Sequence, residues 1–594
     1  MKKIKTSNQQ AWREVAGALY LLIIAIAVLV SVLLSSQSSL AFGYDPTHEE
    51  KIILSEFAYS VLDSYFDSHA ELNSISSEVF GKIDYFKVFI SLIHNGKLRC
   101  CQSGSTEVSE HRLYFDTIEA VIECIEDDRF GGFLTEDEYP DVEIVFNFLY
   151  DRQKLEENDL YYLGDNIELG IHAIELRRPN YGTYFKESVP ISNNYDLEKT
   201  LARLCNKAGL GEDCYQDPVT SIYKYNTLTF KVNRDNEVID LYRYNILIDL
   251  EEVTNAKIKE SIQLGGQWFL SNLKPFTGIL EYKYYPSSDR YSTSNNHVRQ
   301  LASLWAISEL AVFFDTDIYD ELINKTLDYY LRFKTQGDYL LIEGESKIAY
   351  NAFMILALLN TDYPGRDDFL VDFGDALLSQ QYEDGSYHTY FASEKNTGID
   401  YYPGESMLAL MELYNATQDQ RYLDSVEKAF PYYREYWRNN MNTAFVPWHS
   451  QVYLLLYQQT KDPEVADFVF EMSDWIIDNF QVTKSEYIDA IGGFPRSNPR
   501  NATSVYLEGL NDAYRLAVLV NDKTRQKKYA QSIMNGARFI LQSQYHEKNT
   551  FYLTNPDRAM GGFKESLVSN EQRNDYTQHA VLALIKTYEN NLFE

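Results

Sequence analysis

The C-terminal half of the sequence contains six segments that are apolar on nearly every face of a helix. A helix of this kind has no side that can face water, so other elements must surround it. Amphipathic segments lie near 255–273, 318–334, 366–381, 420–438, 463–480 and 523–543 and alternate with the apolar ones. This alternation predicts two concentric rings of helices, an all-α (α/α)6 toroid over residues 255–594. The apolar segments are HVRQLASLWAISELAVFF (297–314), KIAYNAFMILALL (347–359), PGESMLALMELY (403–414), PWHSQVYLLLY (447–457), TSVYLEGLNDAYRLAVLV (503–520) and DYTQHAVLALIKTY (575–588).

Polar and aromatic residues gather at or near the starts of these six segments. An inner helix of a toroid meets water only at the mouth of the central funnel, so we expect these residues to converge there. Asp575, Gln578 and His579 share one helix face because they are three and four residues apart. Further residues of the same kind are His297, Arg299, Gln300, Tyr350, Asn351, Tyr401, Tyr402, Glu405, Trp448, His449, Thr503, Tyr506 and Glu508.

Three carboxylic acids in this set are candidate catalytic groups: Glu405, Glu508 and Asp575. Glycoside hydrolysis uses two carboxyl groups across the scissile bond, one of them kept protonated by its surroundings. Each acid also has a structural interpretation. Asp575 suits an N-cap, Glu405 suits the first turn of a helix after Pro403, and Glu508 could pair with Arg515.

Other residues of the expected funnel mouth are candidates for substrate binding. Aromatic rings stack on sugars, although they also fill ordinary cores. Arg299 could grip the carboxylate of an acidic sugar, or form a structural ion pair. His297 and His579 could orient a substrate, or be hydrogen-bonded structural histidines. The candidates are His297, Arg299, Tyr401, Tyr402, Trp448, His449, Tyr506, Gln578 and His579.

Recurring short motifs connect this half of the chain to a known superfamily. Four hairpin motifs follow helices at 268–284, 330–343, 377–391 and 539–553. Two Gly-Gly-Phe loops, GGFPRSNPRNATSVYLEG (492–509) and GGFKESLVSNEQRNDYTQHA (561–580), each lead into an apolar segment, as does YYPGESMLAL (401–410). With these motifs, residues 255–590 resemble the six-hairpin glycosidases. The resemblance implies a toroid whose cleft lies at the inner-helix N-termini and whose substrates are polysaccharides or oligosaccharides.

Residues 50–240 have a different pattern, in which helices and strands are mixed. IILSEFAYSVLDSYF and KTLARLCNKAGL have helical periodicity, the latter closed by Gly209 or Gly211. YFKVFISLI, DVEIVFNFL and SIYKYNTLTFKV are typical of strands, the last of them closing the domain. The pattern predicts an α+β domain.

Three stretches of this domain resemble the AMMECR-type family over residues 53–232. They are GKLRCCQSG (96–104), EDDRFGGFLTEDEYPDVEIVFNFL (126–149) and LEKTLARLCNKAGLGEDCYQDPVTSIYKYNTLTFKV (197–232). The family motif is Leu-Arg-Gly-Cys-Ile-Gly. Here Leu98, Arg99 and Cys101 are retained, whereas Cys100, Gln102 and Ser103 replace the other three residues. The resemblance implies a fold rather than an activity. Arg99 and Cys101 acting as a pair are one hypothesis, and a structural turn is the other.

The N-terminal segment predicts a membrane anchor. Residues 1–14 hold Lys2, Lys3, Lys5 and Arg13, and residues 15–36 form an apolar run long enough to cross a bilayer. The next basic residue is Lys51, so the positive-inside rule leaves the N-terminus in the cytoplasm and, after a linker at 37–49, exports the rest. The alternative is a signal peptide cleaved after Ser39-Leu40-Ala41.

Charge and cysteine content narrow the classes of partner. The net charge of −33 disfavours nucleic acid. Histidines are scattered, so the sequence predicts no metal and no cofactor. Cys205 and Cys214 could form a disulfide in an oxidising compartment, or remain small unpaired hydrophobic residues.

Taken with the toroid and the N-terminal segment, these features lead us to expect an extracytoplasmic protein, anchored in the lipid bilayer, that processes a polysaccharide as a hydrolase, lyase or epimerase. The alternative is a non-catalytic module that binds glycan or an envelope protein.

Overall fold

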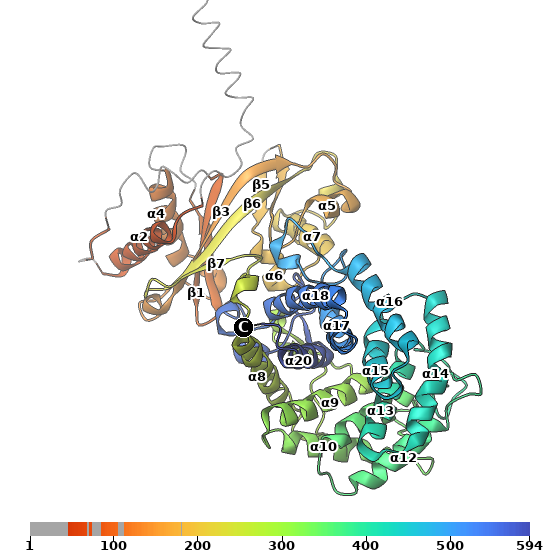
Figure 1. Ribbon diagram of the computed structural model, residues 1–594. Coiled ribbons are helices and arrows are strands. Elements are labelled where there is room, and N and C mark those ends of the chain that lie inside the picture. The colour runs from red at the N-terminus through yellow and green to blue at the C-terminus, as the bar shows by residue number, and fades with distance from the viewer. Residues whose placement is uncertain (1–44, 68–69, 74–84, 105–111, 180, 594) are drawn as a thin grey trace, which may run out of the picture.

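The computed structural model describes residues 45–67, 70–73, 85–104, 112–179 and 181–593. Figure 1 shows a sheet with flanking helices in the first part of the chain and a bundle of helices in the rest. The predicted anchor at 15–36 lies outside these residues. Among the residues described, no helix is long and apolar enough to span a bilayer.

Six helices form the inner ring of the C-terminal part, residues 255–593, all of which the structure describes. Each contacts the next along the chain, and the last packs against the first, so that the ring is closed. The ring therefore encloses a central axis, as the sequence predicts. The inner helices are α9 (His297–Phe314), α11 (Ile348–Leu359), α13 (Tyr402–Thr417), α15 (Phe445–Thr460), α17 (Ala502–Leu519) and α20 (Asn574–Glu589).

Six further helices pack outside this ring and alternate with the inner helices in the sequence. Their polar faces meet water while their apolar faces cover the inner helices. Side chains cap several of them. Thr254 accepts a hydrogen bond from the amide of Lys257 at the start of α8, and Asp462 caps α16 just before Pro463. The outer helices are α8 (Asn255–Ser271), α10 (Asp320–Leu331), α12 (Arg366–Leu378), α14 (Gln420–Asn439), α16 (Pro463–Phe480) and α18 (Lys523–Gln542).

Burial explains why the inner segments carry so few charges. In α11, every residue from Ile348 to Leu358 is buried. Polar residues near the N-termini of three inner helices hold the loop that precedes the helix. Gln300 bonds to both backbone groups of Leu280, Asn351 accepts from the amide of Leu340, and Thr503 accepts from the amide of Phe494. These side chains fix the loops that surround the funnel.

The N-terminal part is built on a seven-stranded antiparallel sheet, counted over the described residues, in the order β2-β1-β3-β6-β4-β5, with β7 also paired to β6. SIYKYNTLTFKV forms β6, as predicted, but β7 follows it, so β6 is not the final strand. The strands are β1 (Lys87–His94), β2 (Lys97–Ser103), β3 (Glu143–Lys154), β4 (Ala173–Arg178), β5 (Tyr181–Phe185), β6 (Ser221–Val232) and β7 (Val238–Leu241). A small second sheet joins β8 (Lys283–Tyr285), β9 (Arg290–Tyr291) and β10 (Gln572–Arg573).

Helices cover this sheet and two disulfides tie the domain together. The helices are α2 (His48–Phe66), α4 (Arg112–Ile125), α5 (Leu160–Asn166), α6 (Ser188–Asn193) and α7 (Leu197–Lys207). Cys205 and Cys214 form a disulfide, which decides between the two possibilities left by the sequence. Cys100 and Cys124 form a second one, which the sequence analysis does not predict.

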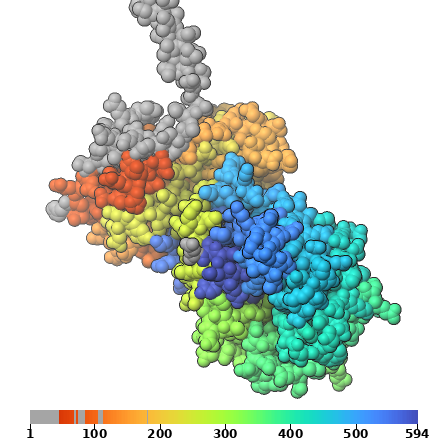
Figure 2. Space-filling view, in the orientation of Figure 1, coloured from red at the N-terminus to blue at the C-terminus, as the bar shows by residue number. Residues whose placement is uncertain are grey.

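The two parts of the chain pack against each other through a buried interface. Figure 2 shows the early residues in direct contact with the C-terminal residues, and the middle of the chain at the far end of the molecule. Ile93, Val145 and Leu241 of the sheet share an apolar cluster with Phe551. The Gln542 side chain of α18 accepts from the amide of Ile248 and donates to the carbonyl of Ile246, and the Gln542 carbonyl accepts from the Asn245 side chain.

A buried arginine stands at the centre of this interface. The Arg243 guanidinium lies 2.6 Å from the Asp489 carboxylate, and both side chains are 2% exposed. The same guanidinium lies 2.6 Å from Glu168, which belongs to the N-terminal part. Arg243 thus joins the loop after α16 to the segment after α5.

We expect Arg243→Met to lower the free energy of unfolding by about 3–5 kcal/mol, because it leaves the buried Asp489 charge without a partner. Arg243→Met combined with Asp489→Leu should recover most of this loss. Urea denaturation followed by tryptophan fluorescence measures both. Arg421→Met, which removes an exposed ion pair with Asp419, is the matched control and should cost about 1 kcal/mol or less. Equal losses for Arg243→Met and Arg421→Met would contradict this account.

Candidate active site

The N-terminal ends of the inner helices surround a cavity of about 570 Å³. This volume lies within the range of cavities that hold small ligands, roughly 300–1,000 Å³. We call it the funnel cavity. Its lining includes Asn296, Arg299, Phe353, Tyr401, Tyr402, Glu405, Trp448, Arg500, Asn501, Tyr506, Glu565, Arg573, Asp575, Tyr576, Gln578 and His579.

Glu405 stands in the first turn of α13 and lines this cavity. Gly404 beside it allows α13 and α15 to approach closely, because a Cβ there would lie 2.8 Å from the Trp448 Cβ. Glu405 is 4% exposed, and its Oε2 has no hydrogen-bond partner among the residues that the structure describes. Burial raises the pKa of its carboxyl from 4.5 to about 8. The group is therefore protonated at neutral pH.

Asp575 lines the same cavity from the start of α20 and has the opposite protonation state. Arg573 grips its two oxygens at 2.5 and 2.8 Å, and Arg299 lies 3.0 Å away. Burial alone would raise the pKa of this carboxyl, but the hydrogen bonds and charge of Arg573, with the charge of Arg299, hold it below 3.8. Asp575 does not cap the helix: the N-cap is Arg573, without a side-chain bond.

His579 faces the cavity one turn further into α20, with Glu508 behind it. The His579 Nδ1 lies 2.6 Å from Glu508 Oε1 and 3.2 Å from Gln578 Nε2. Since a carboxylate oxygen accepts and does not donate, Nδ1–H donates to Glu508, and Nε2 is the ring nitrogen left for another partner. Glu508 itself is 1% exposed and does not line the cavity. It pairs with His579, not with Arg515.

Aromatic rings form much of the cavity wall. Tyr401 and Tyr402 meet edge to face, and Trp448 lies edge-on to both Phe353 and His579. The Tyr506 hydroxyl donates to Thr443 Oγ1 over 3.0 Å. Flat rings set beside polar groups suit the alternating apolar faces and hydroxyl edges of a sugar.

Nine of the residues that the sequence nominates therefore line one cavity: Arg299, Tyr401, Tyr402, Glu405, Trp448, Tyr506, Asp575, Gln578 and His579. The Arg299 guanidinium binds Asp575 and the Tyr282 hydroxyl. The structure therefore does not show it gripping a sugar carboxylate. Its structural interpretation, an ion pair, is the observed one.

Three nominated residues lie elsewhere. Glu508 supports His579 from behind, as described above. The His297 Nδ1 bonds to the Tyr330 hydroxyl at 3.1 Å. His449 is fully buried, stacks on Phe445 and bonds to its carbonyl, and burial lowers its pKa to about 3. His297 begins α9 and His449 stands in the second turn of α15, but both side chains bond to the protein and neither lines the cavity.

Three charged residues of the cavity escape the sequence reasoning: Arg500, Glu565 and Arg573. Arg500 and Glu565 lie on the two Gly-Gly-Phe loops, which pair with each other through Arg500 and Ser566. Both loops lead directly into inner helices, and this connection is the sequence signal that points to them.

The Arg99–Cys101 hypothesis meets a different geometry. Arg99 donates to the carbonyls of Phe130, Gly132 and Phe133 and forms an ion pair with Glu138 at 3.0 Å. These bonds use the guanidinium to fix a loop. Cys101 is a free, half-buried thiol on β2, and its backbone carbonyl accepts from Arg129. The structural interpretation of Arg99 is the one that this geometry favours.

A comparison with protein-family models matches the N-terminal part of the chain. Residues 55–230 match the family model described as AMMECR1. This part of the chain is an AMMECR1 domain. Protein PAE0745 of Pyrobaculum aerophilum is 29% identical over 189 residues, which are 31% of this chain and 86% of that protein.

Two solved structures similar to a larger share of the chain are carbohydrate enzymes. A cellobiose 2-epimerase from Bacillus thermoamylovorans is 10% identical, covers 56% of this chain and 98% of its own, and has a TM-score of 0.45. A family 76 glycoside hydrolase from a bovine Bacteroides thetaiotaomicron strain is 11% identical, covers 75% and 95%, and has a TM-score of 0.42. Similarity this weak says nothing about the chemistry of the funnel cavity.

The raised pKa of Glu405 makes stability depend on pH in a defined direction. Between pH 4.5 and about 8, the folded state holds a proton on Glu405 that the unfolded state has lost. Each rise in pH across this window therefore destabilises the folded wild type. We expect Glu405→Gln to gain stability relative to wild type between these values and to gain nothing further below pH 4.5. Urea midpoints across the pH range measure the gain, with the exposed Glu394→Gln as control. A constant difference at all pH values would refute the assignment.

Proposed function

We propose that the funnel cavity is the active site of a glycoside hydrolase that acts on an oligosaccharide or polysaccharide. The observation that carries this proposal is the pair Glu405 and Asp575, two carboxyl groups on the wall of one aromatic cavity. Glu405 has an unpartnered oxygen there, and Asp575 is held ionised by two arginines. Surroundings that keep one carboxyl group protonated and the other ionised are typical of the proton donor and its ionised partner in glycoside cleavage.

The chemistry follows from these protonation states. Glu405 donates its proton to the glycosidic oxygen as the bond from that oxygen to the anomeric carbon breaks, and the leaving sugar departs with a hydroxyl group. The positive charge that develops on the anomeric carbon is stabilised by the negative Asp575, which stays ionised throughout. A water molecule then bonds to the anomeric carbon, and the Glu405 carboxylate takes up its proton. Glu405 is thereby restored, and one water is consumed for each bond cleaved.

The other residues of the cavity position the substrate. Tyr401, Tyr402 and Trp448 offer flat apolar faces, and Gln578 has a buried amide oxygen without a partner among the described residues. Hydroxyl groups of a sugar are donors that such an oxygen can accept from. Arg573 and Arg299 fix the orientation of Asp575.

Removing either carboxyl tests the proposal. We expect Glu405→Gln to lower kcat by about 10²–10⁴-fold, as for other general acids. Asp575→Asn should lower kcat/KM strongly as well, because the charge that opposes the anomeric carbon is lost. Reducing-sugar release from a panel of polysaccharides measures both, and thermal melting shows whether each variant folds. Glu412→Gln, at the far end of α13, is the matched control.

The pH dependence gives a second readout from the same assay. Glu405 acts in its protonated form, so kcat/KM of the wild type should fall as pH rises through about 8. On the acid side, activity should persist below the ordinary range of an aspartate, because the pKa of Asp575 is lowered. Full turnover by Glu405→Gln and Asp575→Asn would rule out the carboxylate mechanism. Glycan binding without any turnover by wild type would favour the non-catalytic module.

A second candidate function rests on the pair of His579 and Glu508. A histidine whose Nδ1–H is held by a buried carboxylate presents Nε2 as a base, which suits proton abstraction beside a sugar carbonyl. Epimerases and isomerases use such a step. Their signature is deuterium from solvent appearing on the carbon next to the carbonyl, detected by NMR after incubation of free sugars in D₂O. We expect none for the hydrolase. Deuterium incorporation that His579→Ala abolishes would transfer the assignment to an epimerase.

We also propose that the enzyme works outside the cytoplasmic membrane, tethered through residues 15–36. The apolar run and its flanking basic residues support this location. Two disulfides, Cys100–Cys124 and Cys205–Cys214, support it as well, because such bonds persist in oxidising compartments. A polysaccharide of the cell envelope would be within reach there, and so would envelope proteins.

A further inference from the structure

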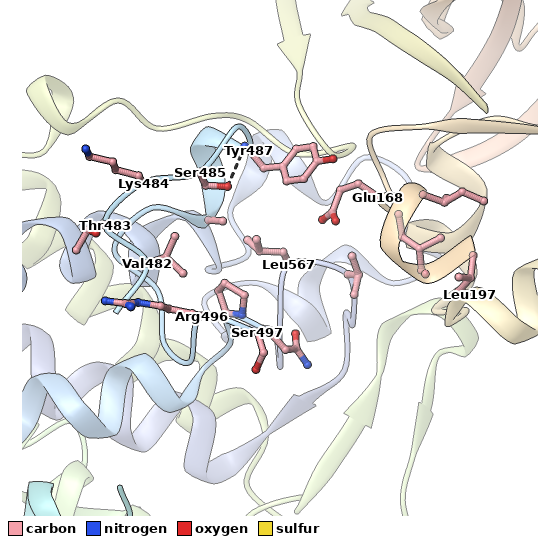
Figure 3. Close-up of a pocket in the computed structure, with 17 residues that line it drawn as sticks. Glu168, Leu197, Val482, Thr483, Lys484, Ser485, Tyr487, Arg496, Ser497 and Leu567 are labelled. Carbon is pink, nitrogen blue, oxygen red and sulfur yellow. Dashed lines mark hydrogen bonds between the residues drawn. The ribbon is translucent and has the colours of Figure 1, made fainter. Parts of the chain in front are cut away.

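A second and larger cavity, of about 880 Å³, lies between the AMMECR1 domain and the toroid. We call it the interdomain cavity. Figure 3 shows Glu168 and Leu197 of the AMMECR1 domain on one side, and Val482, Tyr487 and Ser497 of the toroid on the other. The toroid contributes the loop between α16 and α17 and a short stretch before β10.

The interdomain cavity and the funnel cavity share a wall. Arg500 and Glu565 line the funnel cavity, whereas Pro499 and Leu567 line the interdomain cavity. The amide of Asn501 donates to the Glu565 carbonyl at 2.8 Å, so the two loops that carry these residues are bonded to each other. Neighbouring residues on the same two loops thus face two cavities. These paired loops contribute side chains to both cavities.

The chemistry of the interdomain cavity suits a saccharide. Its wall mixes apolar side chains with hydroxyl and amide groups, including Thr483, Ser485, Ser497 and Asn498. Tyr487 adds an aromatic ring. The guanidinium of Arg496, a cationic residue of this wall, donates to the backbone carbonyls of Gln481 and Asp478. Sugars bind to such walls through their hydroxyl edges and their apolar ring faces.

The two walls are held at a fixed separation, so the cavity exists before any ligand binds. Arg243 joins Glu168 to Asp489, next to Ala490 of the wall. Two residues after Val568 of the wall, the side-chain Nδ2 of Asn570 donates to the backbone carbonyl of Ile191 over 2.8 Å. Binding to a preformed cavity avoids the cost of ordering its walls.

We propose that the interdomain cavity is a second binding site for the glycan whose scissile bond lies in the funnel cavity, with one wall supplied by the AMMECR1 domain. The inference rests on the proposed function and specifies its substrate as an extended chain rather than a single sugar or disaccharide. The AMMECR1 domain then takes part in substrate recognition.

Two variants close the cavity from opposite sides. Gly164 of α5 lines it, and a Cβ there would meet only the Leu197 Cδ2, at 3.8 Å. Gly164→Phe therefore places a ring in the cavity without a backbone clash. Ser497→Trp does so from the toroid, at an exposed position. Lys527→Trp, on the exposed face of α18, is the matched control. Thermal melting confirms the folding of each.

The assay uses oligosaccharides from disaccharide to decasaccharide, prepared from the polysaccharide of the panel (mannan, xylan, laminarin or polygalacturonate) that the wild type cleaves. We expect kcat/KM of the wild type to rise with chain length. In Gly164→Phe and Ser497→Trp, KM for the long substrates should rise about tenfold, which is the loss of 1.4 kcal/mol of binding. Turnover of the shortest cleaved substrate should stay at the wild-type value, and Lys527→Trp should behave as wild type.

The outcomes separate this inference from the function on which it rests. If the wild type cleaves glycans but chain length has no effect, or if both blocked variants keep the wild-type length dependence, the second site is wrong and the hydrolase stands. If the wild type cleaves no glycan, the hydrolase is wrong. Retardation in native gels that contain each polysaccharide then decides: loss of retardation in the blocked variants but not in Glu405→Gln supports the interdomain site, and any other pattern overturns it.

Discussion

The closed ring of inner helices is the constraint on which the rest of the toroid depends. Each helix of the ring packs between two inner neighbours and the outer helices, so nearly all its length is out of water. Polar side chains of these helices can then meet water or a ligand only near the helix ends. Glu405, Trp448 and Asp575 come from three different helices, far apart in the sequence, yet they line one cavity because each stands in a first turn.

The same closure sets the electrostatics of the site. Packing of α13 against α15, made possible by Gly404, removes water from Glu405 and keeps its carboxyl protonated. Asp575 is equally buried, but Arg573 lies two residues before it and Arg299 reaches it from α9. Two acids of ordinary affinity for protons are thus driven to opposite states by neighbours alone. The difference lies in whether an arginine is within reach.

The sequence predicts the helices better than the faces they present. Apolar periodicity places all twelve helices of the toroid, within the described residues, to within a few positions, because burial leaves a strong pattern. It does not distinguish a polar residue that faces the funnel from one that faces a loop. Gln300 and Asn351 hold loops, and His449 packs on Phe445, although all three stand near helix starts as Glu405 does. Helical periodicity does not predict Arg573 and Glu565 as site residues, because both lie outside the helices.

The buried Arg243 has a consequence for the independence of the two halves. Its guanidinium contacts a carboxylate from each half at once, beside an apolar cluster to which Phe551 contributes from the toroid. If the chain were cut between β7 and α8 and the halves separated, the apolar cluster and the Asp489 carboxylate would both be exposed to water. Neither fragment would keep the contacts that bury this interface, so we expect the two halves of the chain to be stable only together.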